Sequence, residues 1–414
     1  MQSYWNDAEA EDYRRAAGDD PDRQALALRV YTSRLLGREP DLVLHGGGNT
    51  SVKVDGGRIM HVKGSGWDLA TIEAPGLPGL RLAPLLDVRH GGRLSDPEMV
   101  DMLRANMIDP SGPNPSVETL LHAFLPARYV DHTHSAATLA IANQPDAAER
   151  AREIFGDRLA IVPYVMPGFD LAIEAAACFD RAPGCEGLFL VNHGLFSFDD
   201  DARVSYEKIL GFTSECEDYL AKNAATLVPA EAGRAVDADL RAKVFAALGA
   251  ALRQDPVFAG VVALDLRANA LIDRYLALPN LAEVVRRGTI TPDHVIRLKP
   301  SPLIGAAGYS QGDWAKAIGG YAEDYRAYFE RHAPHASEPK TMLDPMPRLV
   351  LVQGLGIIGV GRNEKEARIC ADLGEQAARV VVSAEKLGRF TPITEAQLFE
   401  MEYWSLEQAK LKAA

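Results

Sequence analysis

Two histidines two residues apart are the first residues in this sequence whose spacing suggests chemistry. His132 and His134 end the stretch YVDHTH, whose residue types favour a β-strand. Residues i and i+2 of a strand project from the same face, so the two imidazoles should lie side by side. That arrangement suits two ligands of one zinc ion, although two ordinary histidines at a strand end would show the same spacing.

A third histidine could complete such a site. His193 lies in Asn192-His193-Gly194, which interrupts the apolar run GLFLVNHGLFSF. A buried imidazole needs polar partners, a need that a hydrogen-bonded core histidine would also meet. Three histidine ligands leave a fourth metal position open to substrate, which is typical of catalytic zinc. The sequence therefore predicts a metal site at these three histidines.

A metal site of this kind needs a base, and Glu118 is the candidate. The stretch PSVETLLHAFL, residues 115–125, favours a helix capped by Ser116, with Glu118 in its first turn. The helix dipole would stabilise the carboxylate there, and a capping role alone would also explain the residue. His122, one turn later, is a rival metal ligand, but this position more often serves packing or hydrogen bonding.

Two glycine-containing stretches could bind an anion. GGGNTS offers backbone amides beside Asn49, and VKGSG adds Ser65 and Gly66. The amides of such loops can form a concave phosphate site. Neither is a Walker loop, because the Gly-Lys-Ser/Thr ending is missing, and two tight turns would have the same composition.

The elements that must position these residues alternate between strand-like and helix-like stretches, which predicts the α/β class. Residues 21–37 favour a helix that Pro21 opens. A strand at 41–44 and two strands joined at residues 55–57 should follow. A long amphipathic helix is predicted at 200–223.

A polar, alanine-rich stretch at 222–240 predicts a boundary between a domain at 1–225, which carries the candidate site, and a C-terminal domain at 226–414 of uncertain role. In the second domain, the pattern of strand, turn, strand and helix that begins at RLVLVQGLGIIGVG echoes residues 188–222 without the histidine. This indicates a degenerate internal duplication, with chance similarity as the alternative.

Gly354-x-Gly356-x-x-Gly359 superficially matches a dinucleotide-binding loop. That loop needs a helix opening directly on the glycines, whereas here another strand-like run follows and the helix begins near Asn363. A glycine-rich hairpin is the better interpretation.

Composition argues against several classes of protein. The formal net charge of −13 disfavours nonspecific nucleic-acid binding. No apolar run reaches the roughly 20 residues of a membrane helix. The polar, acidic N-terminus has no signal-peptide pattern, which predicts a cytoplasmic protein. The four cysteines form no C-x-x-C pair and are expected to be reduced and mostly buried: Cys178, Cys185, Cys216 and Cys370.

The quoted motifs together resemble a known family. GGGNTSVK, VKGSG, PSVETLLH, DHTH and VNHGLFSF occur in the order seen in the class II aldolase/adducin family, over roughly residues 22–222. VPYVMPGFDLA, TPDHVIRLKP and EYWSLEQAKL resemble the aldolase portion of bifunctional rhamnulose-1-phosphate aldolase/alcohol dehydrogenases. The resemblance implies a three-layer α/β/α fold with a central, mainly antiparallel sheet, followed by a smaller α/β domain.

The resemblance also implies roles for individual residues. The metal, Zn²⁺ or another divalent ion, would bind to His132, His134 and His193, with Glu118 as the base. The phosphate cradle would include Gly48, Asn49, Ser65, Gly66 and Ser116. Sugar-phosphate aldolases often have a second serine where this chain has Val117, which removes a hydroxyl donor. Lys53 or Lys63 would have to compensate for it.

The implied function is cleavage of a ketose 1-phosphate, such as rhamnulose 1-phosphate, to dihydroxyacetone phosphate and an aldehyde by a homotetramer. A tyrosine, for which Tyr164 is a candidate, would act as a second acid. Another lyase, dehydratase or epimerase on the same fold is the alternative. An adducin-like binding module should have lost its histidines. The dehydrogenase domain of the bifunctional proteins is not part of these 414 residues, so we expect no oxidoreductase activity from them.

Overall fold

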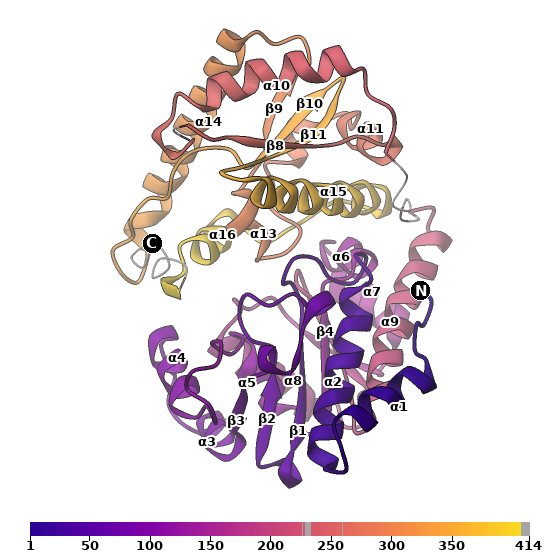
Figure 1. Cartoon of the computed structure of the whole chain (residues 1–414). Helices are drawn as coiled ribbons and strands as arrows, with labels where there is room; N and C mark the ends of the chain where they lie inside the picture. The colour runs from indigo at the N-terminus through magenta and orange to yellow at the C-terminus, as the bar shows by residue number, and fades with distance from the viewer. Residues whose placement is uncertain (226, 228–232, 259, 407–414) are drawn as a thin grey trace. The chain divides into compact units, whose positions relative to one another are not determined.

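The computed structural model divides the chain into two compact units. It describes residues 1–225, 227, 233–258 and 260–406. The first unit comprises Met1–Ala142 and Asp146–Asn223, and the second comprises Asn143–Pro145 and Ala224–Ala414. Each unit has its own sheet with helices on both faces (Figure 1). Within the described ranges, no helix is both long and apolar enough to cross a bilayer.

The sheet of the first unit has seven strands in the order β3-β2-β1-β4-β7-β6-β5. All neighbouring strands are antiparallel except β5 and β6, which pair in parallel. The strands are β1 (Asn49–Val54), β2 (Ile59–Val62), β3 (Gly79–Arg81), β4 (Tyr129–Thr133), β5 (Leu159–Val162), β6 (Gly187–Leu190) and β7 (Gly194–Asp199). The expected mainly antiparallel central sheet is confirmed.

Helices cover both faces of this sheet, which gives three layers. One face carries α2, α6, α7 and α9, and the other carries α3, α5 and α8. The helices of the first unit are α1 (Asp7–Ala16), α2 (Pro21–Gly37), α3 (Leu82–Asp87), α4 (Asp96–Ala105), α5 (Thr119–Phe124), α6 (Ala136–Ala142), α7 (Ala147–Phe155), α8 (Phe169–Arg181) and α9 (Ala202–Lys222). The helix predicted at 21–37 is confirmed, with the Asp20 side chain capping its free amides.

Two predicted elements differ from the structure. The segment at 41–44 forms no strand, although Leu42 and Val43 are buried. Its carbonyls at Asp41 and Leu42 accept hydrogen bonds from Ala136 and His134, which satisfies the backbone without a place in the sheet. The helix predicted at 115–125 is shorter, because α5 begins only at Thr119.

The second unit contains a four-stranded sheet in the order β8-β11-β10-β9. Its strands are β8 (Ala263–Arg267), β9 (Leu303–Ala306), β10 (Leu349–Gln353) and β11 (Gly356–Gly361). Its helices are α10 (Ala238–Leu252), α11 (Ala270–Leu276), α12 (Leu281–Val284), α13 (His294–Leu298), α14 (Gln311–His332), α15 (Glu364–Leu387) and α16 (Glu395–Glu402). The predicted junction at 222–240 and the motif EYWSLEQAKL both extend into residues outside the described ranges.

The second sheet has the same strand order and directions as half of the first. In each, two parallel strands at one edge (β5 and β6, or β9 and β10) are followed by two antiparallel neighbours. The resemblance extends to single contacts. A Cβ atom on Gly194 would lie 2.4 Å from the Thr133 carbonyl oxygen, and one on Gly356 would lie 2.3 Å from that of Arg267. By this correspondence, Leu266, Ala268 and Leu355 of the second unit stand where the first unit has its three candidate histidines.

The glycines of the dinucleotide-like motif belong to a hairpin, as predicted. Gly354 lies in the turn between β10 and β11, and α15 begins only after β11 has ended. Gly359 allows α15 to approach the strand, because a Cβ there would lie 2.1 Å from the Ala367 carbonyl oxygen.

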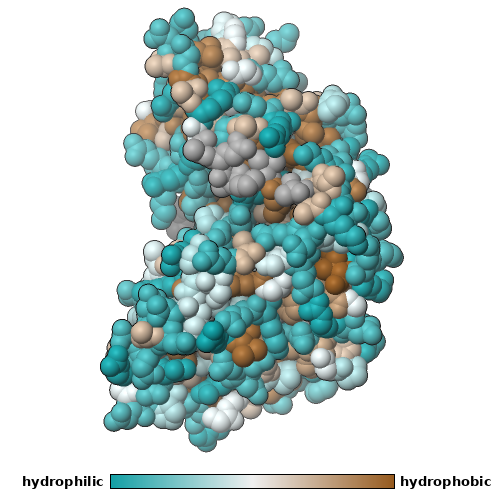
Figure 2. All heavy atoms as spheres, turned by 90° about the vertical axis from the view of Figure 1, so that its right-hand side faces the viewer, coloured by the Kyte–Doolittle hydropathy of each residue, from teal (hydrophilic) through white to brown (hydrophobic). Residues whose placement is uncertain are grey.

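The four cysteines are buried and free, as expected. Hydrophilic side chains cover most of the face shown in Figure 2, where apolar side chains form small separate groups. Scattered apolar residues of this kind are normal on a protein surface.

Candidate metal centre

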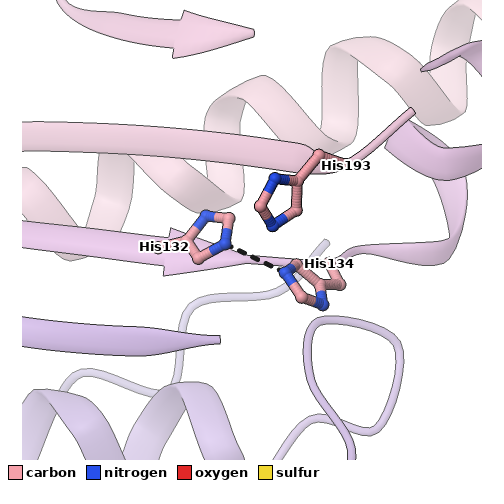
Figure 3. A group of neighbouring side chains, drawn as sticks. All are labelled: His132, His134 and His193. Atoms are coloured by element: carbon pink, nitrogen blue, oxygen red, sulfur yellow. Dashed lines mark hydrogen bonds between the residues drawn. The ribbon is translucent and has the colours of Figure 1, made fainter. Parts of the chain in front are cut away.

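Three imidazole rings converge beside the C-terminal end of β4, in the middle of the first unit's sheet (Figure 3). His132 lies near the end of β4, His134 directly follows that strand, and His193 lies in the turn between β6 and β7. One nitrogen from each ring lies within 4.8 Å of the others. Nε2 of His132 is 2.9 Å from Nε2 of His134. All three side chains are buried, so the rings meet in a water-poor interior.

The backbone around the rings is shaped to let them meet. Asn192 adopts a left-handed conformation at φ 57°, which turns the chain sharply before His193. Gly194 has no space for a side chain, because a Cβ would lie 2.4 Å from the Thr133 carbonyl oxygen; it would also lie within 3.2 Å of the His132 and His134 rings. Gly48, at φ 63°, passes against the His132 carbonyl oxygen in the same way. These residues allow three segments to approach one point.

His132 is held as a neutral imidazole with one nitrogen directed at its neighbours. Its Nδ1 donates to the Leu195 carbonyl oxygen at 2.9 Å, which leaves the lone pair on Nε2. Its ring stacks on Phe196 with centroids 4.0 Å apart. Burial lowers the pKa of His132 well below its ordinary value, and the neighbouring rings of His134 and His193 lower it further. Metal ligation requires this neutral form.

Glu118 lies beside the three rings. Its Oε2 is 3.4 Å from Nε2 of His132, and its Oε1 is 3.4 Å from Nε2 of His193. Asn49 donates a hydrogen bond of 2.6 Å to Oε2. Burial raises the pKa of Glu118 to about 7, while the Asn49 hydrogen bond and the charge of Lys63 act in the opposite direction. A carboxyl group with that pKa can exchange a proton near neutral pH.

The backbone setting of Glu118 differs from the prediction. Glu118 immediately precedes α5 instead of lying in its first turn, and Ser116 does not cap that helix. The Ser116 hydroxyl accepts from the Glu118 amide at 3.3 Å, which forms a local turn ahead of the helix.

His122 lies outside the group of three rings, because its two nitrogens bond elsewhere. Nε2 is hydrogen-bonded to Oδ1 of Asn49, and Nδ1 lies 2.8 Å from the Ser51 hydroxyl. This geometry does not support the rival interpretation of His122 as a metal ligand.

The candidate cradle residues are brought together in part. Nδ2 of Asn49 lies 3.3 Å from the Ser116 hydroxyl. The backbone amides of Ser65 and Ser116 donate to the carbonyls of Asn114 and Lys63 and are therefore used within the fold. Gly66 faces open space at φ 83°.

The two candidate lysines have different surroundings. Lys53 donates to the carbonyls of His122, Leu125 and Ala127 at the end of α5, so its ammonium group is directed away from the cradle. Lys63 donates to the Gly46 carbonyl at 2.8 Å in the glycine-rich turn, and its charge acts on Glu118.

A buried ion pair beneath β4 was not identified from the sequence. Asp131 faces the opposite side of the strand from His132 and binds the guanidinium group of Arg29 on α2 and the hydroxyl of Ser205. All three are fully buried. The one available signal was a charged residue within the strand stretch YVDHT.

These observations agree with a divalent metal site. The three rings are close, buried and, at His132, oriented for ligation, and a carboxylate lies beside them. Nitrogen donors of this kind suit zinc and other transition metals.

Two family models cover most of the chain. Residues 27–220 match the class II aldolase and adducin N-terminal domain, and residues 237–411 match the second domain of class II aldolases. The chain belongs to the class II aldolase family. Members of this family typically depend on a divalent metal, which the three converging histidines accord with.

The chain is also similar to individual proteins. A Bacillus subtilis protein named uncharacterized oxidoreductase YuxG is 31% identical over 410 residues, which is 93% of this chain but 58% of the relative. The N-terminal class II aldolase domain of a conserved Thermoplasma acidophilum protein is 38% identical and covers 53% of this chain and 99% of its own, with a TM-score of 0.46. A structure of L-fuculose 1-phosphate aldolase is 16% identical and covers 54% of this chain and 95% of its own, with a TM-score of 0.37.

Proposed function

We propose that this class II aldolase-family chain is a zinc-dependent aldolase that cleaves a ketose 1-phosphate, such as rhamnulose 1-phosphate, to dihydroxyacetone phosphate and an aldehyde. The observation that carries the proposal is the position of Glu118, whose two carboxylate oxygens lie 3.4 Å from Nε2 of His132 and of His193. A proton-transferring group is thereby placed beside three candidate ligands in a buried site.

In this proposal His132, His134 and His193 hold the metal. The metal, when bound, acts as a Lewis acid that stabilises negative charge developing on substrate oxygens. At His132 the protein supplies a neutral donor, because burial and the neighbouring rings disfavour imidazolium there.

Glu118 moves the proton at carbon. In the cleavage direction, the substrate C4 hydroxyl passes its proton to a second acid–base group as the C3–C4 bond breaks, which releases the aldehyde and leaves an enediolate of dihydroxyacetone phosphate. Glu118 then gives a proton to C3 of this enediolate, and in the synthetic direction it removes that proton. A pKa of about 7 suits both directions. Tyr164, on the segment between β5 and α8, is our candidate for the second acid.

The phosphate group would bind to the cradle of Gly48, Asn49, Ser65, Gly66 and Ser116. Lys63 is better placed than Lys53 to offset the hydroxyl absent at Val117, because it binds the glycine-rich turn. The absent hydroxyl, together with the engagement of Asn49 by Glu118, keeps an unphosphorylated substrate as a second candidate. The same site would then serve another metal-dependent lyase, dehydratase or epimerase reaction on a sugar or hydroxy acid.

A paired substrate screen tests the proposal. Ketose 1-phosphates and the matching unphosphorylated ketoses are incubated with the zinc-loaded protein, and aldehyde release is measured. We expect release from a ketose 1-phosphate that is lost in the Glu118→Gln variant. Release only from unphosphorylated ketoses would reject the phosphate assignment, and no release from any ketose would reject the aldolase assignment.

A further inference from the structure

Three polar side chains from β1 attach α5 to the sheet. Asn49, Ser51 and Lys53 are alternate residues of the strand, so they project from one face. Asn49 and Ser51 bond to the two ring nitrogens of His122, and Lys53 donates to the carbonyl oxygen of the same residue at 3.1 Å. His122 is therefore held at its ring and at its backbone by one strand.

The contacts of Asn49 connect His122 to Glu118, the proposed base. Its Nδ2 donates to Oε2 of Glu118 at 2.6 Å, while its Oδ1 faces Nε2 of His122. The four hydrogen-bonded residues are each at most 6% exposed, so water does not compete freely for these bonds: Ser51, His122, Asn49 and Glu118.

The contact between Asn49 and Glu118 determines which groups donate in this series of hydrogen bonds. Nδ2 of Asn49 donates to Oε2 of Glu118, so the Asn49 oxygen faces Nε2 of His122. Nε2 of His122 must then carry a hydrogen, which leaves Nδ1 to accept from the Ser51 hydroxyl. The reverse amide orientation would set the Asn49 oxygen against the carboxylate.

His122 is suited to this role because it is kept neutral. Burial lowers the pKa of His122 well below its ordinary value, and the charges of Lys53 and Arg29 lower it further. Phe196 covers the ring, with centroids 5.4 Å apart. A neutral imidazole carries one hydrogen, and its neighbours determine which nitrogen holds it.

We propose that His122 is a positioning residue whose Nε2–H fixes the amide orientation of Asn49 and, through it, the carboxylate of Glu118. The proposal rests on the proposed function in so far as Glu118 is the base. It assigns His122 a directional role that simple packing would not require.

The hydrogen position can be measured without any substrate. We would record ¹⁵N–¹H correlation spectra of the imidazoles in the zinc-loaded full chain and assign His122 by its absence in the His122→Gln variant. A neutral ring with hydrogen on Nε2 supports the proposal. Hydrogen on Nδ1, or an imidazolium ring at neutral pH, overturns it. This result does not depend on whether the protein is an aldolase.

Activity provides the second arm. His122→Leu removes the donor, and we expect the rate constant for proton exchange into dihydroxyacetone phosphate to fall by about 10–100-fold with zinc content and KM unchanged. His122→Gln keeps an N–H donor and should recover most of the loss. His294, buried in the second unit and bonded to Thr291, is the control, and His294→Gln should not change the rate.

The outcomes separate the two proposals. An unchanged exchange rate in His122→Leu, or an equal loss in His122→Gln, would reject the positioning role. If wild-type protein shows no exchange, the proposed base fails, and the spectrum alone decides the role of His122. If His122→Leu does not fold, the His122→Gln rate and the spectrum still test the proposal.

Discussion

Glu118 places Oε2 3.4 Å from Nε2 of His132, although a helix and a loop separate the two residues along the chain. The contact forms because β4 carries His132 toward α5 on the face opposite the Arg29–Asp131 ion pair. A buried carboxylate beside the neutral His132 ring is stabilised by a nearby positive charge. This relationship therefore links the metal to the base.

Replacing Glu118 with glutamine should separate metal binding from proton transfer. The glutamine side chain would keep the size and polarity of the original but could not accept the proton, so we expect exchange of dihydroxyacetone phosphate protons to slow by roughly 10²–10⁴-fold. Zinc content, measured by elemental analysis, should remain that of the wild type. An unchanged exchange rate would show that another group is the base.

The stability of the metal-free protein should depend on pH through Glu118. Burial raises the pKa of this carboxyl group to about 7, above its ordinary value of 4.5, so the folded state binds the proton more tightly than the unfolded state. Its contribution to stability is fully present below pH 4.5 and is lost as pH rises to about 7. Relative to Glu118→Gln, metal-free wild type should lose about 3 kcal/mol of unfolding free energy over this range. Chemical denaturation at about pH 5 and about pH 8 measures the difference, and parallel curves for the two proteins would contradict it.

Gly194 should be intolerant of any side chain. A Cβ there would lie 2.4 Å from the Thr133 carbonyl oxygen and close to two candidate ligands. We expect Gly194→Ala to destabilise the protein by about 1–3 kcal/mol and to weaken zinc binding, as measured by thermal unfolding and metal titration.

Two other glycines provide matched controls. Gly356→Ala meets similar contacts in the second unit and should destabilise the protein without affecting zinc. Gly211 is exposed on α9 with no atom near its added Cβ, so Gly211→Ala should stabilise slightly, by about 0.5–1 kcal/mol. Wild-type zinc affinity in Gly194→Ala would contradict the described geometry.

Local sequence patterns predicted the helices and strands whose formation depends on neighbouring residues in the chain. The helix opened by Pro21 and the strand that carries His132 follow from local sequence pattern, and the structure has both. The stretch at 41–44 has strand-like residues but bonds to the segment after β4, a partner that local pattern cannot reveal. For the same reason the sequence identified Lys53 as a candidate phosphate ligand, whereas the strand directs it to the end of α5.

The sequence was enough to predict which residues form the candidate site, but not the hydrogen bonds among them. The spacing of His132 and His134 and the polar break at His193 named residues that the fold brings together. The hydrogen bonds that join Glu118 through Asn49 to His122 depend on how α5 packs against β1, which composition does not determine.

We propose that His132, His134 and His193 together bind one divalent metal ion. The most direct test is elemental analysis of the full chain and of His134→Ala, purified in parallel and loaded with the same zinc solution before removal of excess metal. We expect about one zinc per folded wild-type chain, as in three-histidine catalytic sites, and near-complete loss in the variant. A folded wild-type protein without bound metal, or a variant with undiminished zinc, would contradict it.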